Sequence, residues 1–526
     1  MTLLFRDHVT RVGAGRLSVA IALLLTVRLG SASEKRTDTS AQVTPRSTRT
    51  LIHAIERKVP ETLKQNGVPG AAVAIIRKGE VVWMSGFGMA SLETRTRVTP
   101  GTIFNVGSLS KTPAAWAVMQ LVERGEIRLD TPIDQVISRW HLPPSTFDSN
   151  AVTIERLLSH TSGISNHDYH GWDPGSALPP IEDSLAGKTG TGEVRVVSAP
   201  GSGFHYSGAN FAILELLLEE KSGQALTPYM QSHIFAPLHM NRTQYGLPAD
   251  AAATMATPYD SFGKPLPLLR YNELAAAGLT TDLHDLASFA AAALPDKKDS
   301  PAGRGLLRPS TLKLMETAAP NTMWAQHDPY GPSPQYGLGY TVRPNQLAGH
   351  TGVGHGGTNS GWESLVQIIP DTGDGLIVMT NSSNGSAVIA DVMCVWRQWA
   401  SRTAACPQVD VQIPLCQAYI HGGAKAAVSL YRKLRSEAKE RYDFSAFELN
   451  GMGYRVMRLG DLQGAITLFK LNVESFPQDW NVYDSLGEAY AKAGDKADAI
   501  ANYRRSLQLN PSSESGQAAL KQLEAQ

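Results

Sequence analysis

The chain has 526 residues, more than one hydrophobic core usually serves, so at least two domains are expected. Hydrophobic residues at 42% and charged residues at 18% exclude a disordered chain and a multi-span membrane protein. Because Lys+Arg and Asp+Glu each number 48, there is no basic field for phosphates, and no nucleic acid partner is expected.

The first 33 residues have the pattern of a secretory signal. Three arginines precede an apolar run at 17–27, which is too short to span a bilayer comfortably, and small residues follow at 31–33. We expect a signal peptide over 1–33, a linker over 34–50, and an exported protein, periplasmic or secreted. If the segment is not cleaved, it is expected to act as a membrane anchor.

Two predicted strand pairs lie far apart in the sequence. Residues 71–76 and 81–84 flank a turn at Lys78-Gly79-Glu80, and 363–369 and 375–379 flank a second turn. Helical patterns and loops rich in Pro and Gly lie between the pairs. This order predicts an α+β domain over 51–402, with one antiparallel sheet covered by helices.

A helix is expected to begin near Ser108. Apolar residues lie on all sides of it from Leu109 to Val122, which predicts a helix buried between two layers. Pro113 falls in the first turn, where a missing N–H costs little, and Gly125 ends the helix.

The end of the chain repeats itself. Gly453, Asp461 and Pro477 recur 34 residues later as Gly487, Asp495 and Pro511. This is the tetratricopeptide period, so we expect an all-α tetratricopeptide-repeat domain over 426–523, after a linker at 403–425. A degenerate first unit is expected around 426–431. Repeats of this kind dock onto a protein partner or onto their own neighbouring domain.

Ser108 and Lys111 form an S-x-x-K motif at the start of the predicted helix. Residues three apart share a helix face, so the lysine amine can approach the serine hydroxyl. A serine hydroxyl is a poor nucleophile until a base takes its proton, and a partly buried lysine can serve as that base. Spacings of this kind also arise by chance. The surrounding sequence is not G-x-S-x-G, so the nucleophile elbow of α/β-hydrolases is absent.

Further landmarks follow in order along the chain: Phe104-Asn105-Val106-Gly107, Leu157-Leu158-Ser159-His160-Thr161-Ser162-Gly163, Pro200-Gly201, Ala277-Gly278-Leu279, Gly354-His355-Gly356-Gly357 and Thr380-Asn381. With them, the sequence resembles the class C β-lactamases, the related DD-peptidases and the serine esterases of the same fold, from about residue 50 to 400. The resemblance implies a β-lactamase/transpeptidase-like fold with a helical subdomain, and it implies that Ser108 is the nucleophile and Lys111 its partner.

The resemblance also implies that Tyr206 is the tyrosine of the family's Tyr-x-Asn motif. Its phenol would be a phenolate-type base or a proton relay, which requires a positive neighbour such as Lys111 to lower its pKa from about 10. The third position departs from the family, since Gly208 offers no side-chain amide. Asn210 is not expected to substitute for it.

The Lys-Thr-Gly element of the lactamases corresponds to His355-Gly356-Gly357. A second triplet, His350-Thr351-Gly352, lacks the Gly and the aromatic residue at the family spacing. The backbone N–H groups near Thr358 and of Ser108 are implied to form the oxyanion hole. A histidine at position 355 gives less fixed positive charge than lysine at pH 7.

The implied reaction is acyl transfer on an amide or ester carbonyl of a small peptide or ester. The two departures, Gly208 and His355, favour a D-amino-acid peptidase of the DD-carboxypeptidase kind or an esterase. A weak β-lactamase is one alternative, and a non-catalytic binding protein that uses its repeats is another. No cofactor or metal is expected, because His167 and His170 lack a third ligand of suitable spacing.

The three cysteines are Cys394, Cys406 and Cys416. An odd number excludes complete pairing within the chain, and none lies near the motifs above. A Cys406–Cys416 bridge is conceivable in an oxidising compartment.

Overall fold

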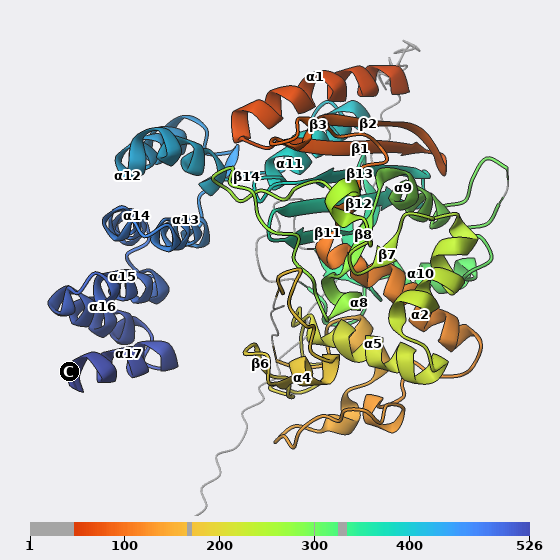
Figure 1. Cartoon of the computed structure of the whole chain (residues 1–526), viewed down its shortest axis with the longest axis horizontal. Coiled ribbons are helices and arrows are strands. Elements are labelled where there is room, and N and C mark those ends of the chain that lie inside the picture. The colour runs from red at the N-terminus through yellow and green to blue at the C-terminus, as the bar shows by residue number, and fades with distance from the viewer. Residues whose placement is uncertain (1–46, 166–170, 299, 324–333, 526) are drawn as a thin grey trace, which may run out of the picture. The chain divides into compact units, whose positions relative to one another are not determined.

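A computed structural model describes residues 47–165, 171–298, 300–323 and 334–525 (Figure 1). From Arg46 onward the chain is one compact unit. The expected signal peptide, most of the expected linker at 34–50, and both His167 and His170 lie outside the described residues. Among the helices that the structure does describe, none is both long and apolar enough to cross a membrane.

An eight-stranded antiparallel sheet organises the first part of the chain, in the order β3-β2-β1-β13-β12-β11-β10-β9. Its strands are β1 (Gly70–Arg77), β2 (Glu80–Ser91), β3 (Thr96–Arg97), β9 (Gln335–Tyr336), β10 (Thr341–Leu347), β11 (His350–Asn359), β12 (Trp362–Ile369) and β13 (Asp374–Thr380). Both predicted strand pairs are confirmed as β1–β2 and β12–β13. The pairing of β1 with β13 joins them into one sheet.

Both faces of the sheet are covered, and the alternation of side chains along β1 shows how. Ala71, Val73 and Ile75 pack on one face against α1 (Thr48–Asn66) and α11 (Ser386–Ala400). Ala72, Ala74 and Ile76 belong to the core on the opposite face. Because successive side chains of a strand point to opposite faces, a strand buried on both sides is apolar throughout. The expected α+β architecture, a sheet covered by helices, is confirmed.

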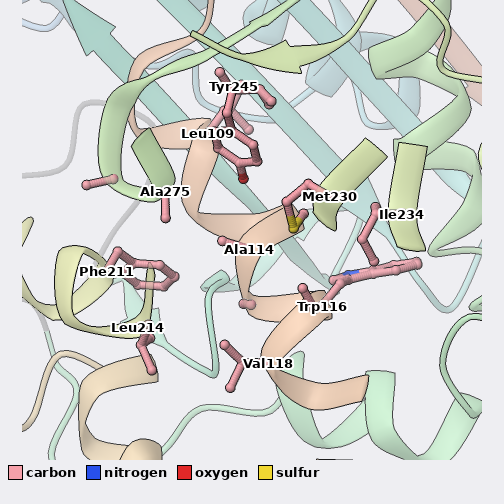
Figure 2. Close-up of a cluster of buried hydrophobic side chains, with 14 of the residues drawn as sticks. Leu109, Ala114, Trp116, Val118, Phe211, Leu214, Met230, Ile234, Tyr245 and Ala275 are labelled. Atoms are coloured by element: carbon pink, nitrogen blue, oxygen red, sulfur yellow. The ribbon is translucent and has the colours of Figure 1, made fainter. Parts of the chain in front are cut away.

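The opposite core is built around α2 (Lys111–Glu123), whose residues are buried from Lys111 to Leu121. Figure 2 shows Trp116 and Ala114 of this helix lying among Met230, Ile234 and Phe211. The regular helix begins at Lys111 and is preceded by a 3₁₀ turn, η1 (Gly107–Ser110), which contains Ser108. The prediction of a buried helix is therefore correct, with the nucleophile candidate one turn ahead of it.

The remaining elements of this part are short. The helices are α3 (Ile154–Leu158), α4 (Ile181–Leu185), α5 (Ala209–Ser222), α6 (Leu226–Met230), α7 (Ala251–Thr254), α8 (Leu274–Ala277), α9 (Leu283–Ala292) and α10 (Pro309–Met315). Two small sheets complete it, one of β4 (Phe104–Asn105), β8 (Leu279–Thr281) and β7 (Gln244–Tyr245), the other of β5 (Ala186–Gly187) and β6 (Gly192–Glu193).

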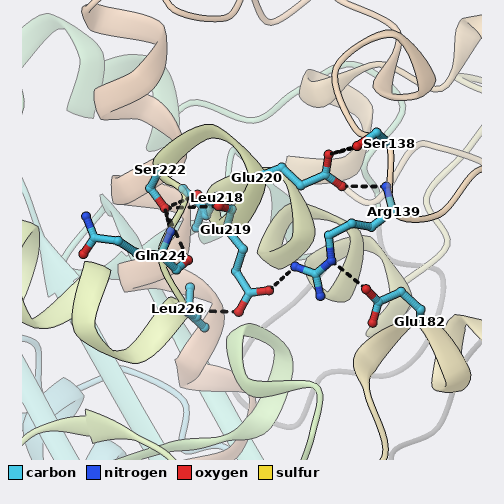
Figure 3. Close-up of polar contacts among 9 residues, drawn as sticks. All are labelled: Ser138, Arg139, Glu182, Leu218, Glu219, Glu220, Ser222, Gln224 and Leu226. Carbon is cyan, nitrogen blue, oxygen red and sulfur yellow. Dashed lines mark hydrogen bonds and ion pairs between the residues drawn. The ribbon is translucent and has the colours of Figure 1, made fainter.

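Polar contacts anchor the far end of α5, which carries the residues that follow Tyr206. The guanidinium of Arg139 lies 2.6 Å from a carboxylate oxygen of both Glu182 and Glu219. Glu220 accepts hydrogen bonds from the backbone N–H groups of Ser138 and Arg139 (Figure 3). Arg139 thereby ties α4, α5 and the segment after α2 together at a partly exposed position, where ion pairs contribute modestly to stability.

The C-terminal region is helical, as expected. It comprises α12 (Gln412–Glu437), α13 (Ala446–Arg458), α14 (Leu462–Ser475), α15 (Trp480–Lys492), α16 (Lys496–Leu509) and α17 (Glu514–Ala525). The pair α13–α14 recurs as α15–α16 with starts 34 residues apart. A Cβ added at Gly453 would lie 2.5 Å from the ring of Phe469, and one added at Gly487 would lie 3.2 Å from the ring of Tyr503. The repeating glycines therefore admit an aromatic ring from the second helix of each pair.

The segment at 403–425, expected as a linker, is helical from Gln412, and α12 is kinked at Gly422 and Gly423. Val411, Leu415 and Cys416 of this segment are buried in the same core as Ala427 and Tyr431 beyond the kink, so the segment joins the packing of the repeats. The boundaries at 402 and 426 stay a prediction.

The disulfide joins Cys394 to Cys406, not Cys406 to Cys416. Residues after α11 turn back and bring Cys406 beside the last turns of that helix. Cys416 is free and fully buried on α12, where its thiol contacts the sulfur of Met452. The idea of a Cys406–Cys416 bridge is thus wrong, since Cys416 is part of the helical core.

Candidate active site

Residues 102–121 are all buried except Ser108, which is half-buried. Its turn is held by Ser110, whose hydroxyl donates to the carbonyl oxygen of Gly107 at 2.6 Å and accepts from the N–H of Leu279 at 2.9 Å. The carbonyl of Ser110 accepts from the hydroxyl of Tyr245 at 2.6 Å. The turn is therefore fixed on several sides, while Ser108 itself stays partly exposed.

Lys111 lies directly beside Ser108, with Nζ 3.0 Å from Oγ. A 3₁₀ turn eclipses residues i and i+3, which accounts for the close approach. The side chain of Lys111 is fully buried, and this burial lowers its pKa well below 10.5 because the charged form loses its hydration. The amine is thus poised to be neutral, and a neutral amine can accept a proton.

A second contact holds the amine in place. Nζ donates to the carbonyl oxygen of Ala276 at 2.7 Å. The short helix α8 that carries Ala276 is itself held by Glu215 of α5, which accepts from the N–H of Ala275 at 2.8 Å. Burial raises the pKa of Glu215 well above 4.5. Sequence reasoning missed Glu215, and its only signal was a polar residue in an otherwise apolar helix.

Tyr206 is hydrogen-bonded to the hydroxyl of Ser108, and the amine of Lys111 lies 5.1 Å from the centre of its ring. The structure therefore brings Ser108, Lys111 and Tyr206 together. Burial raises the pKa of Tyr206 above 10. The expectation that a positive neighbour lowers this pKa is wrong, because loss of hydration disfavours the phenolate and outweighs the hydrogen bond with Ser108. Tyr206 is a neutral phenol that can relay a proton.

His160 supports the tyrosine from behind, with ring centres 4.3 Å apart. The ring nitrogen Nδ1 of His160 lies 2.8 Å from the amide nitrogen of Asn210, whose amide oxygen accepts from Ser162 at 2.6 Å. Asn210 is fully buried and occupied in this way, which agrees with the expectation that it does not replace the missing amide at Gly208. The Ser-His-Thr-Ser-Gly landmark is thus a packing element behind Tyr206.

The nucleophile turn and strand β11 touch backbone against backbone. A Cβ added at Gly357 would lie 1.8 Å from the carbonyl oxygen of Val106, and one added at Gly107 would lie 2.7 Å from the backbone nitrogen of Thr358. Gly107 also has φ +53°, which favours glycine. Strand β10 pairs with β11 only as far as Gly354, which leaves this stretch of β11 to face η1. The N–H groups of Ser108 and Thr358, the implied oxyanion hole, come from these two adjoining segments.

Two further contacts lock this junction. The hydroxyl of Ser364 on β12 donates to the carbonyl oxygen of Val106 at 2.9 Å. The amide of Asn359 donates to the side-chain oxygen of Asn105 at 2.6 Å, and that oxygen also accepts from the N–H of Gly107. Sequence reasoning missed Asn359 and Ser364, because polar residues on a strand carry no local signal for a distant partner.

His355 is buried behind the junction, with 4% of its surface exposed. Its Nε2 lies 2.8 Å from the hydroxyl of Tyr336, and the two rings pack edge to face. Burial, together with the nearby Lys111, lowers the pKa of His355 to about 3, so the imidazole is neutral at physiological pH. The structure gives His355 a supporting position, whereas Gly356 and Thr358 reach the surface. The triplet at 350–352 begins the same strand at a more exposed position.

Among the described residues, no group of His, Cys, Asp or Glu is arranged to hold a metal ion. The expectation about His167 and His170 is not tested, since both lie outside these residues.

Comparison with known proteins places most of this chain in one family. Residues 55–392 match the family model described as Beta-lactamase, and residues 480–513 match a tetratricopeptide repeat. An unguisins hydrolase of Aspergillus campestris is 28% identical over 62% of this chain and 61% of its own length. A D-aminopeptidase of Brucella anthropi is 28% identical over 64% of this chain and 60% of its own length. The chain thus spans less than two thirds of either relative.

Among solved structures, the octameric penicillin-binding protein homologue from Pyrococcus abyssi is 27% identical, with a TM-score of 0.55 over 65% of this chain and 76% of that one.

The close contact at Gly357 generates a first prediction. Gly357→Ala should destabilise the protein by about 1–3 kcal/mol, because the added methyl meets a backbone oxygen that cannot turn aside. It should also displace Ser108. Gly356→Ala is the matched control, since its Cβ would meet only the carbonyl oxygen of Ser364 at 3.7 Å. Urea unfolding of both variants measures the difference, and equal stability of the two would contradict this account of the junction.

Proposed function

Since the chain belongs to the β-lactamase family of serine hydrolases, we propose that it hydrolyses amide or ester carbonyls through an acyl-enzyme on Ser108. The observation that carries this proposal is the buried amine of Lys111, 3.0 Å from the hydroxyl of Ser108. A buried amine of lowered pKa can take the serine proton as the oxygen attacks the carbonyl carbon. The bond formed is the ester between the oxygen of Ser108 and the carbonyl carbon, and the bond broken joins that carbon to the leaving nitrogen or oxygen.

Tyr206 completes the proton path in this proposal. The proton taken from Ser108 passes to the leaving group through the phenol of Tyr206, which is hydrogen-bonded to Ser108 and stays protonated overall. The N–H groups of Ser108 and Thr358 stabilise the negative oxygen of the tetrahedral intermediate. Water then attacks the ester and gives its proton to Lys111, directly or through Tyr206. The proton returns to the oxygen of Ser108 as the ester bond breaks and the acid leaves.

For the substrate class, we propose a peptide that contains D-amino acids or a small ester. The D-aminopeptidase and the penicillin-binding homologue among the relatives support this choice. The site lacks a side-chain amide at Gly208, and His355 is neutral and buried, so a β-lactam carboxylate would find fewer partners than the family pattern provides. A weak β-lactamase activity is the alternative within the same mechanism.

We also propose export and a protein partner for the repeats. The Cys394–Cys406 disulfide is typical of oxidising compartments outside the cytosol and supports export. The match of residues 480–513 to a tetratricopeptide repeat supports a protein partner, because repeats of this kind present extended surfaces that bind proteins.

Covalent labelling tests the nucleophile. A fluorophosphonate probe should label the wild-type protein but not Ser108→Ala. Hydrolysis of p-nitrophenyl butyrate should fall at least about a thousandfold in the variant, because the atom that forms the ester is gone. Ser288→Ala, at a partly exposed helix position outside the site, is the control and should label normally. A wild-type protein that takes no label would favour the non-catalytic binding protein instead.

The pH profile tests the base. Only the neutral amine accepts a proton, so kcat/KM should rise with pH and level off well below 10.5, because burial lowers the pKa of Lys111. Lys111→Ala should remove this rise together with most of the activity. Tyr206→Phe should lower the plateau and keep the rise. If kcat/KM of Lys111→Ala still rises with pH as in the wild type, the rise is due to the titration of another group.

Substrate comparison tests the class. We expect kcat/KM for nitrocefin to be at least about tenfold below that for p-nitrophenyl butyrate or D-alanine p-nitroanilide, with the L-alanine anilide as a control for stereochemistry. Gly208 has φ −64° and ψ −29°, angles that any residue adopts, so asparagine fits the backbone there. Gly208→Asn should raise nitrocefin turnover. A wild-type rate on nitrocefin near the diffusion limit would contradict the proposed class.

A further inference from the structure

A pocket of about 430 Å³ opens at the end of β11, next to the nucleophile turn. Its lining includes Thr358, Asn359, Ser360, Glu363, Tyr271 and Arg455. Thr358 belongs both to this pocket and to the junction with Gly107, so the pocket adjoins the implied oxyanion hole. A substrate whose carbonyl oxygen lies at the Thr358 N–H would therefore be bound beside this pocket.

One lining residue comes from far along the chain. Arg455 lies on α13, outside the residues 55–392 that match the family model. Its side chain is half-buried, and its charge acts on Glu363 of β12 and on Glu448 of its own helix. The repeat region therefore contributes a cation to the wall of a pocket in the sheet domain.

The position of α13 is supported by a polar junction between the two regions. Asp391 of α11, almost fully buried, accepts from the hydroxyl of Thr62 at 2.6 Å and pairs with Arg441, just ahead of α13. Strand β14 (Val409–Asp410) pairs with β15 (Tyr442–Asp443) in the same place. The side chain of Arg441 is 34% exposed, so this ion pair contributes modestly to stability, and together with the β14–β15 pairing it marks where the two regions meet.

Arg455 and Glu363 are the two charged side chains among the described residues that line the pocket. The carboxyl of Glu363 lies 2.8 Å from the hydroxyl of Thr358, and burial raises its pKa to about 8, so it is largely protonated at pH 7. Within the described chain, Arg455 has no carboxylate within ion-pair distance, and its side-chain hydrogen bond is to the thiol of Cys416. The guanidinium therefore retains unused donors toward the pocket.

We propose that Arg455 makes this pocket a binding site for a carboxylate of the substrate, so that the repeat region selects anionic substrates for the serine hydrolase site. The inference rests on the proposed function. A guanidinium presents a planar fork of N–H donors that matches a carboxylate. Ser360 lines the same place and carries a hydroxyl, whereas the Asn359 amide already donates to Asn105 and Ala277.

Two pairs of esters distinguish where the carboxylate lies on the substrate. On the acyl side, mono-p-nitrophenyl glutarate is compared with p-nitrophenyl pentanoate. On the leaving-group side, 3-carboxyphenyl pentanoate is compared with 3-carbamoylphenyl pentanoate. The wild-type full chain should prefer the anionic member of at least one pair.

Arg455→Gln should lower kcat/KM for that anionic ester roughly ten- to a hundredfold, mainly through KM, which is the range of a hydrogen bond to a charged group. The neutral ester should stay within about threefold, and Arg455→Lys should fall between. Arg458→Gln, an exposed arginine one turn further along the same helix, should change neither rate.

Two outcomes would overturn the proposal: no anionic preference in either pair, or an equal loss for anionic and neutral esters in Arg455→Gln. If that variant fails to fold, the wild-type protein decides, since glutarate but not glutaramide should then inhibit hydrolysis of the neutral ester competitively. Failure of glutarate to inhibit would equally overturn it. Fluorophosphonate labelling of Ser108 in each sample separates this failure from failure of the proposed hydrolase activity.

Discussion

The site depends on keeping the amine of Lys111 out of water. Its Nζ lies between the hydroxyl of Ser108 and the carbonyl of Ala276, at the buried end of α2. Without that burial the amine would remain protonated at neutral pH and could not take a proton. The apolar helix α2, the contact of α5 with α8 through Glu215, and the ring of Tyr206 all keep this amine surrounded. The side chains that pack around Lys111 therefore also lower the pKa of its amine.

The second constraint is the contact between two backbones. The turn that carries Ser108 lies very close to β11. A methyl group at Gly357 would overlap the backbone of the turn, and one at Gly107 would overlap the backbone of the strand. A mutual distance fixed by main-chain atoms varies less than one fixed by long side chains, which suits an oxyanion hole built from two N–H groups. Asn359 and Ser364 bind the turn to the sheet on both sides of this contact. Strand β11 pairs with β12, which pairs with β13 and through it with β1. The pairing of these strands therefore fixes the position of Thr358.

Sequence patterns predicted the features that depend on near neighbours. Alternation and turn residues predicted β1–β2 and β12–β13, and the three-residue spacing predicted the approach of Lys111 to Ser108. Properties that depend on residues far apart in the sequence could not be predicted in this way. The pKa of Tyr206 rises because residues far apart in sequence exclude water from it, and Cys394 pairs with Cys406 because the chain turns back after α11. Arg455 carried no motif at all.

The sequence divides into a hydrolase domain and a repeat region, but residues of both regions line the pocket beside Thr358. A repeat region attached by a loose tether would leave Arg455 at no fixed distance from Thr358. The contact of Asp391 with Arg441 and the pairing of β14 with β15 instead place α13 beside the sheet domain. With the proposed carboxylate site, substrate choice would depend on how the repeat region packs against the sheet domain, because α13 belongs to the first and lines a pocket in the second.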